Sequence, residues 1–159
     1  MTIKPQLAED AILDQVKFPC IVQPKIDGVR ALNLRGTLTG RSLKPFEGFG
    51  ITERFSGDQY LGLDGEMILG SKPNCTDRLC SLTTGAMGRF NGVDKMADLQ
   101  WNVFDLVLSV TEKLPYIERY RHLTRRVAML QDERITLVPM YVVDNAKHLE
   151  HNISEFFAA

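Results

Sequence analysis

Residues 25–30, Lys-Ile-Asp-Gly-Val-Arg, place an amine, a turn-forming Asp-Gly pair and a permanently charged guanidinium within one short segment. A neutral lysine amine is a nucleophile, and a neighbouring cation suits an anionic substrate, so this combination favours covalent capture of a phosphoryl group. Removing the proton from an ordinary lysine at neutral pH costs about 4.6 kcal/mol. Partial burial or nearby cations reduce that cost, and Arg30 and Arg41 are the candidate cations.

The segments on either side of the Asp-Gly pair predict how Lys25 is held. Residues 19–26 and 29–36 are both rich in apolar residues, and an Asp-Gly pair between two such runs is typical of a tight β-hairpin. Lys25 is then expected near the tip of a rigid ribbon. The same hexapeptide is equally compatible with a plain surface hairpin that carries an exposed lysine.

A pair of carboxylates is the next chemically informative feature. Asp64 and Glu66 are two residues apart in a predicted strand at 61–69, so both side chains face the same side of it. Like charges on an otherwise apolar strand require a metal, an arginine or a ligand hydroxyl nearby. The pair therefore indicates a site rather than a plain structural strand.

Two further side chains are ambiguous when each is considered alone. Phe104 alternates with Leu106 and Leu108 in an apolar run, which favours packing in the core. Arg41 lies in a Gly-Arg-Ser-Leu-Lys-Pro segment, where a solvated turn residue is the ordinary expectation because most arginines lie at the surface.

Taken together and in this order, these segments resemble the small ATP-dependent DNA ligases of bacteriophages and large viruses. The resemblance rests on the lysine motif at 25–30 and on residues 40–45, 63–67 (Leu-Asp-Gly-Glu-Met) and 101–107 (Trp-Asn-Val-Phe-Asp-Leu-Val). The opening residues 4–8 also look like the start of the adenylation domain of such a ligase. Four motifs in the right order are far more specific than any one of them.

The resemblance implies a fold and a reaction. The fold would be the nucleotidyltransferase (ATP-grasp-like ligase adenylation) fold. Lys25 would take AMP from ATP as a phosphoramidate and release pyrophosphate, with Mg²⁺ as the metal cofactor. The partner would be nicked duplex DNA, whose 5'-phosphate and 3'-hydroxyl are joined in replication, repair and recombination.

The resemblance also implies a set of nucleotide-binding residues, namely Gln23, Lys25, Ile26, Arg30, Glu66 and Phe104. Gln23 would contact the adenine edge, and Phe104 would stack on the base. Arg30 and Glu66 would hold the ribose and support the nucleotide, while Arg41 would neutralise a phosphate of the nucleotide or of the DNA end. Guanidinium forks suit phosphates, carboxylates accept from ribose hydroxyls, and aromatic faces suit purines.

The sequence reaches Ala159 before the later Glu-Gly and Lys-x-Lys motifs of that family and before its oligonucleotide-binding domain. We therefore expect residues 1–159 to form a C-terminally incomplete adenylation domain that is a poor or inactive ligase by itself, since one lost electrostatic donor can cost ~100-fold in rate. Two alternatives stay open. One is an RNA ligase or capping-type nucleotidyltransferase, and the other is a non-catalytic binding or inhibitory module.

Composition limits the partners. A net charge of -1 excludes a generally basic nucleic-acid binder, so any DNA contact must be local. Acidic residues dilute the densest basic cluster, which favours a solvated helix face; its members are Arg119, Arg121, Arg125 and Arg126. We expect a monomer in the cytoplasm, or the host cytoplasm if a phage encodes it, without a membrane span. The odd number of cysteines supports neither a disulfide scaffold nor a zinc site.

The periodicity of the chain predicts an α+β domain. After the lysine hairpin we expect strands at 61–69, 99–110 and 135–143, with helices at 115–130 and 146–158. Strands joined mostly by hairpins, with helices grouped late in the chain, indicate antiparallel β-sheets with flanking helices.

Overall fold

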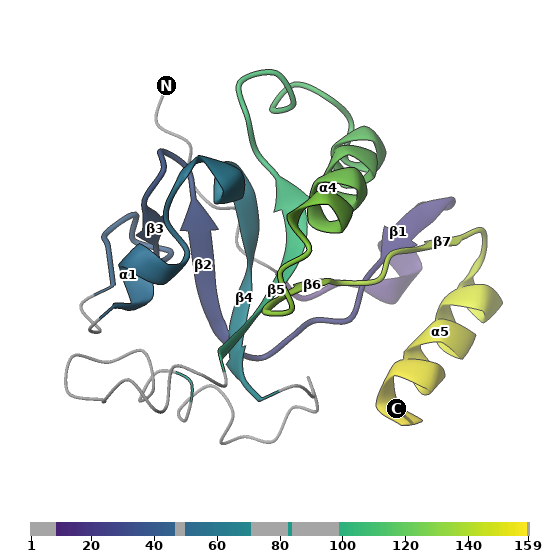
Figure 1. Ribbon diagram of the computed structural model, residues 1–159. Helices are drawn as coiled ribbons and strands as arrows, with labels where there is room; N and C mark the ends of the chain where they lie inside the picture. Colours follow the sequence, from purple (N-terminus) through teal and green to yellow (C-terminus); the bar gives the residue numbers. More distant parts are fainter. Residues whose placement is uncertain (1–8, 47–49, 71–82, 84–98, 159) are drawn as a thin grey trace. The chain divides into compact units, whose positions relative to one another are not determined.

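The computed structural model describes residues 9–46, 50–70, 83 and 99–158 (Figure 1). The chain divides into two compact units, one from residues 1–25 and 138–159 and the other from residues 26–137. Each unit contains one β-sheet and carries helices, so the fold is α+β as predicted.

The unit of residues 26–137 is built on a five-stranded sheet with the order β3-β2-β4-β5-β6. Its pairings are antiparallel, as predicted, except at the edge where β5 and β6 run parallel. A parallel pair needs a long crossover, and helix α4 lies in the connection between these strands. The elements are β2 (Val29–Asn33), β3 (Leu38–Thr39), α1 (Ile51–Arg54), η2 (Asp58–Tyr60), β4 (Leu63–Leu69), β5 (Leu99–Leu106), α4 (Tyr116–Leu130) and β6 (Ile135–Leu137).

One face of this sheet packs against α1 and α4 and forms the core. Trp101 on β5 is fully buried, and its ring meets the Phe55 ring edge to face with centroids 5.7 Å apart. Leu123 brings the apolar stripe of α4 into the same cluster, and Met67 contributes from β4. Burial of these side chains removes apolar area from water and fixes the sheet against both helices.

The unit of the two chain ends has a smaller sheet. Strand β1 (Cys20–Val22) pairs antiparallel with β7 (Tyr141–Val143), and α5 (Ala146–Ala158) follows. The short helix η1 (Leu13–Gln15) precedes β1. The Tyr141 and Phe156 rings lie 5.3 Å apart, which packs α5 on β7.

The predicted lysine hairpin is wrong. Strand β1 pairs with β7, whereas β2 pairs with β3 and β4. A tight Asp-Gly hairpin turn needs positive φ, and Gly28 does not have it. A Cβ at Gly28 would lie 2.1 Å from the carbonyl oxygen of Met67. Glycine is required here because the chain passes close against the β4 backbone, not because it turns back.

The single strand predicted at 135–143 is also wrong, because it is divided. β6 belongs to the five-stranded sheet and β7 to the two-stranded one. Pro139 lies between them, and a residue without an N–H cannot continue a ladder. The strands predicted at 61–69 and 99–110 and the two long helices are confirmed, apart from shifts at their ends.

A polar cluster joins η2 to the start of β6. Arg134 donates hydrogen bonds of 2.7 and 2.6 Å to the two carboxylate oxygens of Asp132, and the Tyr60 hydroxyl donates to the same group at 2.7 Å. The guanidinium of Arg134 also lies 5.1 Å from the centre of the Phe55 ring. The hydrogen bonds from Arg134 lower the pKa of Asp132 from 3.8 to about 2.

We expect Asp132→Asn to lower the free energy of unfolding by about 1–2 kcal/mol at neutral pH, a value discounted for partial solvent screening. The folded-state pKa lies below the unfolded one, so this stabilisation is present above pH 3.8 and is lost as the pH falls toward about 2. The variant and the wild type should therefore converge in acid. Urea unfolding followed through Trp101 fluorescence measures this.

The control for this prediction is Glu133→Gln, which removes an adjacent, exposed carboxylate. Its free energy of unfolding should change by less than about 0.5 kcal/mol. A difference between Asp132→Asn and wild type that stays constant from neutral pH into acid would contradict the assignment.

Candidate nucleotide-binding site

The face of the five-stranded sheet opposite the core carries a row of polar side chains. Arg30 on β2 is the direct cross-strand partner of Glu66 on β4, and Glu66 is the partner of Asn102 on β5. Directly opposed residues on neighbouring strands project to the same face with close Cβ atoms. The sheet therefore brings a cation, a carboxylate and an amide into one line.

Arg30 also forms an ion pair with Asp64. Its Nε and Nη2 donate to the two carboxylate oxygens at 2.6 and 2.7 Å, and the side chains are only 23% and 6% exposed. Burial raises the pKa of Asp64, and the hydrogen bonds from Arg30 oppose that rise. The paired carboxylates were expected to need a metal, an arginine or a ligand hydroxyl nearby, and the structure supplies the arginine. The bidentate contact with Asp64 fixes the direction of the Arg30 guanidinium.

A β-bulge determines where Phe104 lies. Asp64 is paired with Asp105 but the next residue, Gly65, is paired with Val103, so Phe104 is the extra residue of β5. A bulge shifts the alternation of side chains by one residue. Leu106 and Val103 therefore both join the core, and Phe104 is half-buried and outside it. The expectation that Phe104 shares the core face with Leu106 is wrong.

Arg30 and Phe104 meet on this face. The guanidinium carbon of Arg30 lies 4.5 Å from the centre of the Phe104 ring, a cation–π distance. Arg30, Glu66 and Phe104, three residues predicted to bind nucleotide, are thus neighbours. An aromatic face, a fixed guanidinium and a carboxylate together can bind a base, a phosphate and a sugar hydroxyl.

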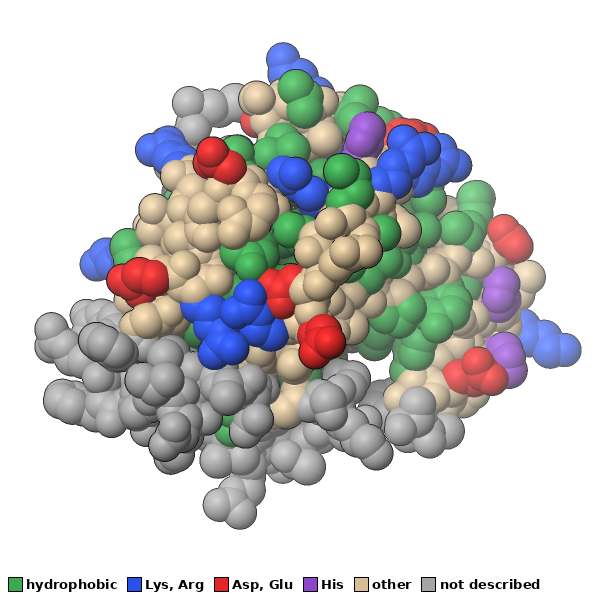
Figure 2. Space-filling view, viewed as in Figure 1, with side chains coloured by type: hydrophobic (Ala, Val, Ile, Leu, Met, Phe, Trp, Pro, Cys, Tyr) green, Lys and Arg blue, Asp and Glu red, His purple; other side chains and the backbone are tan. Residues whose placement is uncertain are grey.

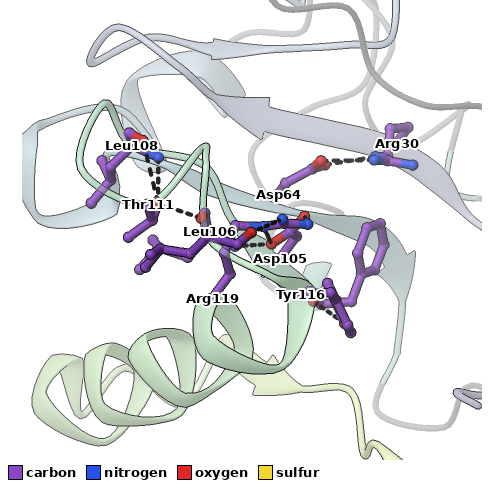
Figure 3. A network of polar contacts seen from close by, with 10 residues as sticks. Arg30, Asp64, Asp105, Leu106, Leu108, Thr111, Tyr116 and Arg119 are labelled. Atoms are coloured by element: carbon purple, nitrogen blue, oxygen red, sulfur yellow. Dashed lines mark hydrogen bonds and ion pairs between the residues drawn. The ribbon is translucent and has the colours of Figure 1, made fainter. Parts of the chain in front are cut away.

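Helix α4 contributes side chains that the sequence did not assign to the site (Figure 3). Arg119 donates two hydrogen bonds of 2.8 Å to the carboxylate of Asp105, and the Tyr116 hydroxyl donates to the carbonyl oxygen of Phe104 at 2.6 Å. Arg119 is only 20% exposed, so its assignment to the solvated basic face is wrong. Arg121, which is 63% exposed and paired with Glu118, does fit that face. The usable signal was Asp105 directly after Phe104, with an arginine in the first turns of the next helix.

Lys25 and Gln23 belong to the other unit. Lys25 is exposed in the extended segment that follows β1, and the Gln23 amide donates to the carbonyl of Val138 at 3.4 Å. Ile26 begins the larger unit and is half-buried. Their nucleotide-binding roles stay predictions.

Arg41 is exposed in a closed turn after β3. The turn is held by backbone hydrogen bonds from Leu43 to the carbonyl of Gly40 at 2.9 Å and from Gly40 to the carbonyl of Lys44 at 3.0 Å. This local closure explains the turn without a ligand. The role of Arg41 at a phosphate also stays a prediction.

The described residues also bear on metal binding, membrane spanning, surface charge and the cysteines. Within the described part of the chain, no group of three or more His, Cys, Asp or Glu side chains is arranged to hold a metal ion. In those same residues no helix has the length and apolar character needed to cross a bilayer. On the face drawn in Figure 2, basic and acidic side chains are interspersed. Cys20 is a free thiol, partly buried on β1, and Cys75 and Cys80 lie outside the described residues.

Comparison with solved structures gives matches to DNA ligases. Chlorella virus DNA ligase-adenylate matches with a TM-score of 0.72 and 22% identity, over 99% of this chain and 58% of that one. A Lig E DNA ligase matches with a TM-score of 0.72 and 14% identity, over 98% and 57%. The ATP-dependent DNA ligase from bacteriophage T7, in complex with ATP, matches with a TM-score of 0.57 and 15% identity, over 88% and 53%.

The similarity is structural rather than sequence-based. No protein-family model matches the chain, and no curated protein matches it in sequence. The chain spans somewhat more than half the length of the ligases that it matches. It has the mixed α+β fold of the adenylation domain of viral and phage ATP-dependent DNA ligases.

Proposed function

We propose that this chain is the adenylation region of an ATP-dependent DNA ligase, with Lys25 as the nucleophile. The observation that carries the proposal is the meeting of Arg30, Glu66 and Phe104 on one sheet face, in a fold that matches a ligase-adenylate. The substrate would be nicked duplex DNA, and nick sealing would serve replication, repair and recombination. The expected state is a monomer.

The covalent step is a nucleophilic substitution at phosphorus. The neutral Nζ of Lys25 attacks the α-phosphorus of ATP, a P–N bond forms, the P–O bond to the β-phosphate breaks and pyrophosphate leaves. The amine loses its proton to solvent. AMP on Lys25 then passes to the 5'-phosphate of the nick, which activates that phosphate for attack by the 3'-hydroxyl.

The residues on the sheet face would bind and orient the nucleotide. Phe104 offers its ring to adenine, and Glu66 accepts hydrogen bonds from ribose hydroxyls. Arg30 is held in direction by Asp64, so it meets the nucleotide without first being ordered. Gln23 would donate to the adenine edge, and Arg41 would contact a phosphate.

Magnesium fits this chemistry as a companion of ATP. Mg²⁺ binds mainly through substrate phosphates and water, with one or two protein carboxylates, so it does not require the preformed cluster that the described residues lack. When bound, it would reduce the negative charge on the phosphates.

The test is nucleotide binding by the whole chain, measured by calorimetry with ATP and GTP. We expect ATP to bind more tightly than GTP, and Phe104→Ala to weaken ATP binding by about 10- to 100-fold, because base stacking on an aromatic ring contributes about 1–3 kcal/mol. Phe104→Tyr keeps the ring and should bind ATP within about threefold of wild type.

Two results would overturn the proposal. Equal ATP affinity for wild type and Phe104→Ala would show that the base does not stack on the Phe104 ring. Tighter binding of GTP than of ATP would favour a capping-type nucleotidyltransferase, and RNA substrates in place of DNA would then be compared directly.

A further inference from the structure

Two carboxylates oppose each other beside the candidate site. Asp64 on β4 and Asp105 on β5 are direct cross-strand partners, and like charges in that position destabilise a sheet. Each carboxylate has its own arginine, which approaches from a different element. Arg30 on β2 binds Asp64, and Arg119 on α4 binds Asp105.

Arg119 is itself held in place at a third point. Besides its two bonds to Asp105, its Nη1 donates to the carbonyl of Leu114 at 2.8 Å, and its guanidinium lies 5.4 Å from the centre of the Tyr116 ring. Asp105 in turn accepts the backbone N–H of Leu106 at 2.8 Å. The pair therefore joins the start of α4 to the end of β5 through a fixed bidentate contact.

The same contact lies next to the bulge. Phe104 is skipped by the β4–β5 ladder, so the ladder alone does not restrain its backbone. Tyr116 restrains it on one side by its bond to the Phe104 carbonyl, and Arg119 restrains the next residue through Asp105 (Figure 3). Beyond the bulge, Thr111 accepts the N–H of Leu108 at 2.9 Å and donates to the carbonyl of Leu106 at 2.8 Å.

Loss of Arg119 would have an effect beyond lost packing. Asp105 would become an uncompensated anion opposite Asp64, and its charge already acts on the guanidinium of Arg30. Arg30 would be divided between two carboxylates and drawn from its place over Phe104. The base-stacking ring and the fixed cation of the site would both be disturbed.

We infer that Arg119 is a positioning residue of the nucleotide site: by neutralising Asp105 it leaves Arg30 to Asp64 and so keeps Arg30 over the Phe104 ring. This inference rests on the proposed function for its ligand, but not for its geometry. Arg119 would not itself contact the nucleotide. Its effect is transmitted through Asp105, which predicts that removal of the charge at Asp105 compensates for loss of Arg119.

The experiment compares ATP affinity across four variants of the whole chain. We expect Arg119→Gln to weaken ATP binding about tenfold. A change of this size lies within the range of interaction energies measured between residues in contact. The double variant Arg119→Gln/Asp105→Asn should recover to within about threefold of wild type, and Asp105→Asn alone should also stay within that range. Arg121→Gln, which removes an exposed arginine from the same helix, should bind ATP as wild type does.

Rescue is the result that shows that the effect of Arg119 on ATP affinity passes through the charge of Asp105. Unchanged ATP affinity in Arg119→Gln, or no recovery in the double variant, would overturn the inference. If the wild type binds no ATP, the proposed function fails, and hydrogen exchange then decides the inference. Faster exchange at the Phe104 and Asp105 amides in Arg119→Gln than in Arg121→Gln supports it, and equal exchange overturns it.

Discussion

Lys25→Ala abolishes covalent capture of nucleotide by this chain: this is the largest effect that we expect. The variant lacks the amine that would form the P–N bond, and no other group replaces it. Two reagents test this. ATP labelled at the α-phosphate, with Mg²⁺, should leave an acid-labile label on Lys25, in the low yield predicted for this chain. Labelling by periodate-oxidised ATP requires only that the nucleotide binds, without phosphoryl transfer. Its ribose dialdehyde should form an imine with Lys25, which borohydride reduces to a stable amine.

The matched control is Lys17→Ala, which removes another exposed lysine from the same N-terminal segment. It should retain wild-type labelling by both reagents, and excess unmodified ATP should protect Lys25 from the dialdehyde. Peptide mass spectrometry locates the modified residue. Persistent label in Lys25→Ala, or wild-type label on a different residue, would end the assignment of Lys25 as the nucleophile.

Gly28→Ala is expected to have the largest effect on stability, about 3 kcal/mol or more in the free energy of unfolding. The added Cβ would lie 2.1 Å from the Met67 carbonyl oxygen and 2.9 Å from Cγ2 of Ile68, so β2 and β4 would have to separate. It would also lie 3.0 Å from Cγ of Glu66. We therefore expect weaker ATP binding as well as a lower midpoint in urea.

Gly40→Ala is the control for this effect. Its Cβ would lie 3.4 Å from the edge of the Phe46 ring and 3.9 Å from the carbonyl oxygen of Arg30, and the position has no positive φ to strain a side chain. The free energy of unfolding should change by less than about 1 kcal/mol. A Gly28→Ala protein as stable as Gly40→Ala would show that β2 and β4 are not packed as closely as the structure has them.

The elements with strong periodicity were predictable from the sequence. β4, β5 and the two long helices follow from apolar spacing alone, because each buries one face and the pattern records that face. The partner of β1, the strand that precedes Lys25, was not predictable in this way. Local turn chemistry favoured a hairpin, but Gly28 is used for a close approach, and a sequence does not distinguish these two needs for glycine.

The candidate site was predictable to a similar extent. Arg30, Glu66 and Phe104 lie together on one sheet face, while their roles stay predictions, and the paired carboxylates correctly indicated a nearby cation. The bulge was not predictable, because one unpaired residue leaves no periodic trace over so short a strand. Arg119 was missed for a related reason. Charge spacing along α4 describes the helix surface, whereas the partner of Arg119 lies on β5.

The pairing of β1 with β7 has a consequence for biosynthesis. Cys20 is the partner of Val143, so this ladder joins strands from near the two ends of the chain. During translation, residues 26–137 emerge before β7 does, and they contain the whole five-stranded sheet. Domains generally fold as units while the chain is being made. The larger unit can thus fold on the ribosome before β7 is available to pair with β1.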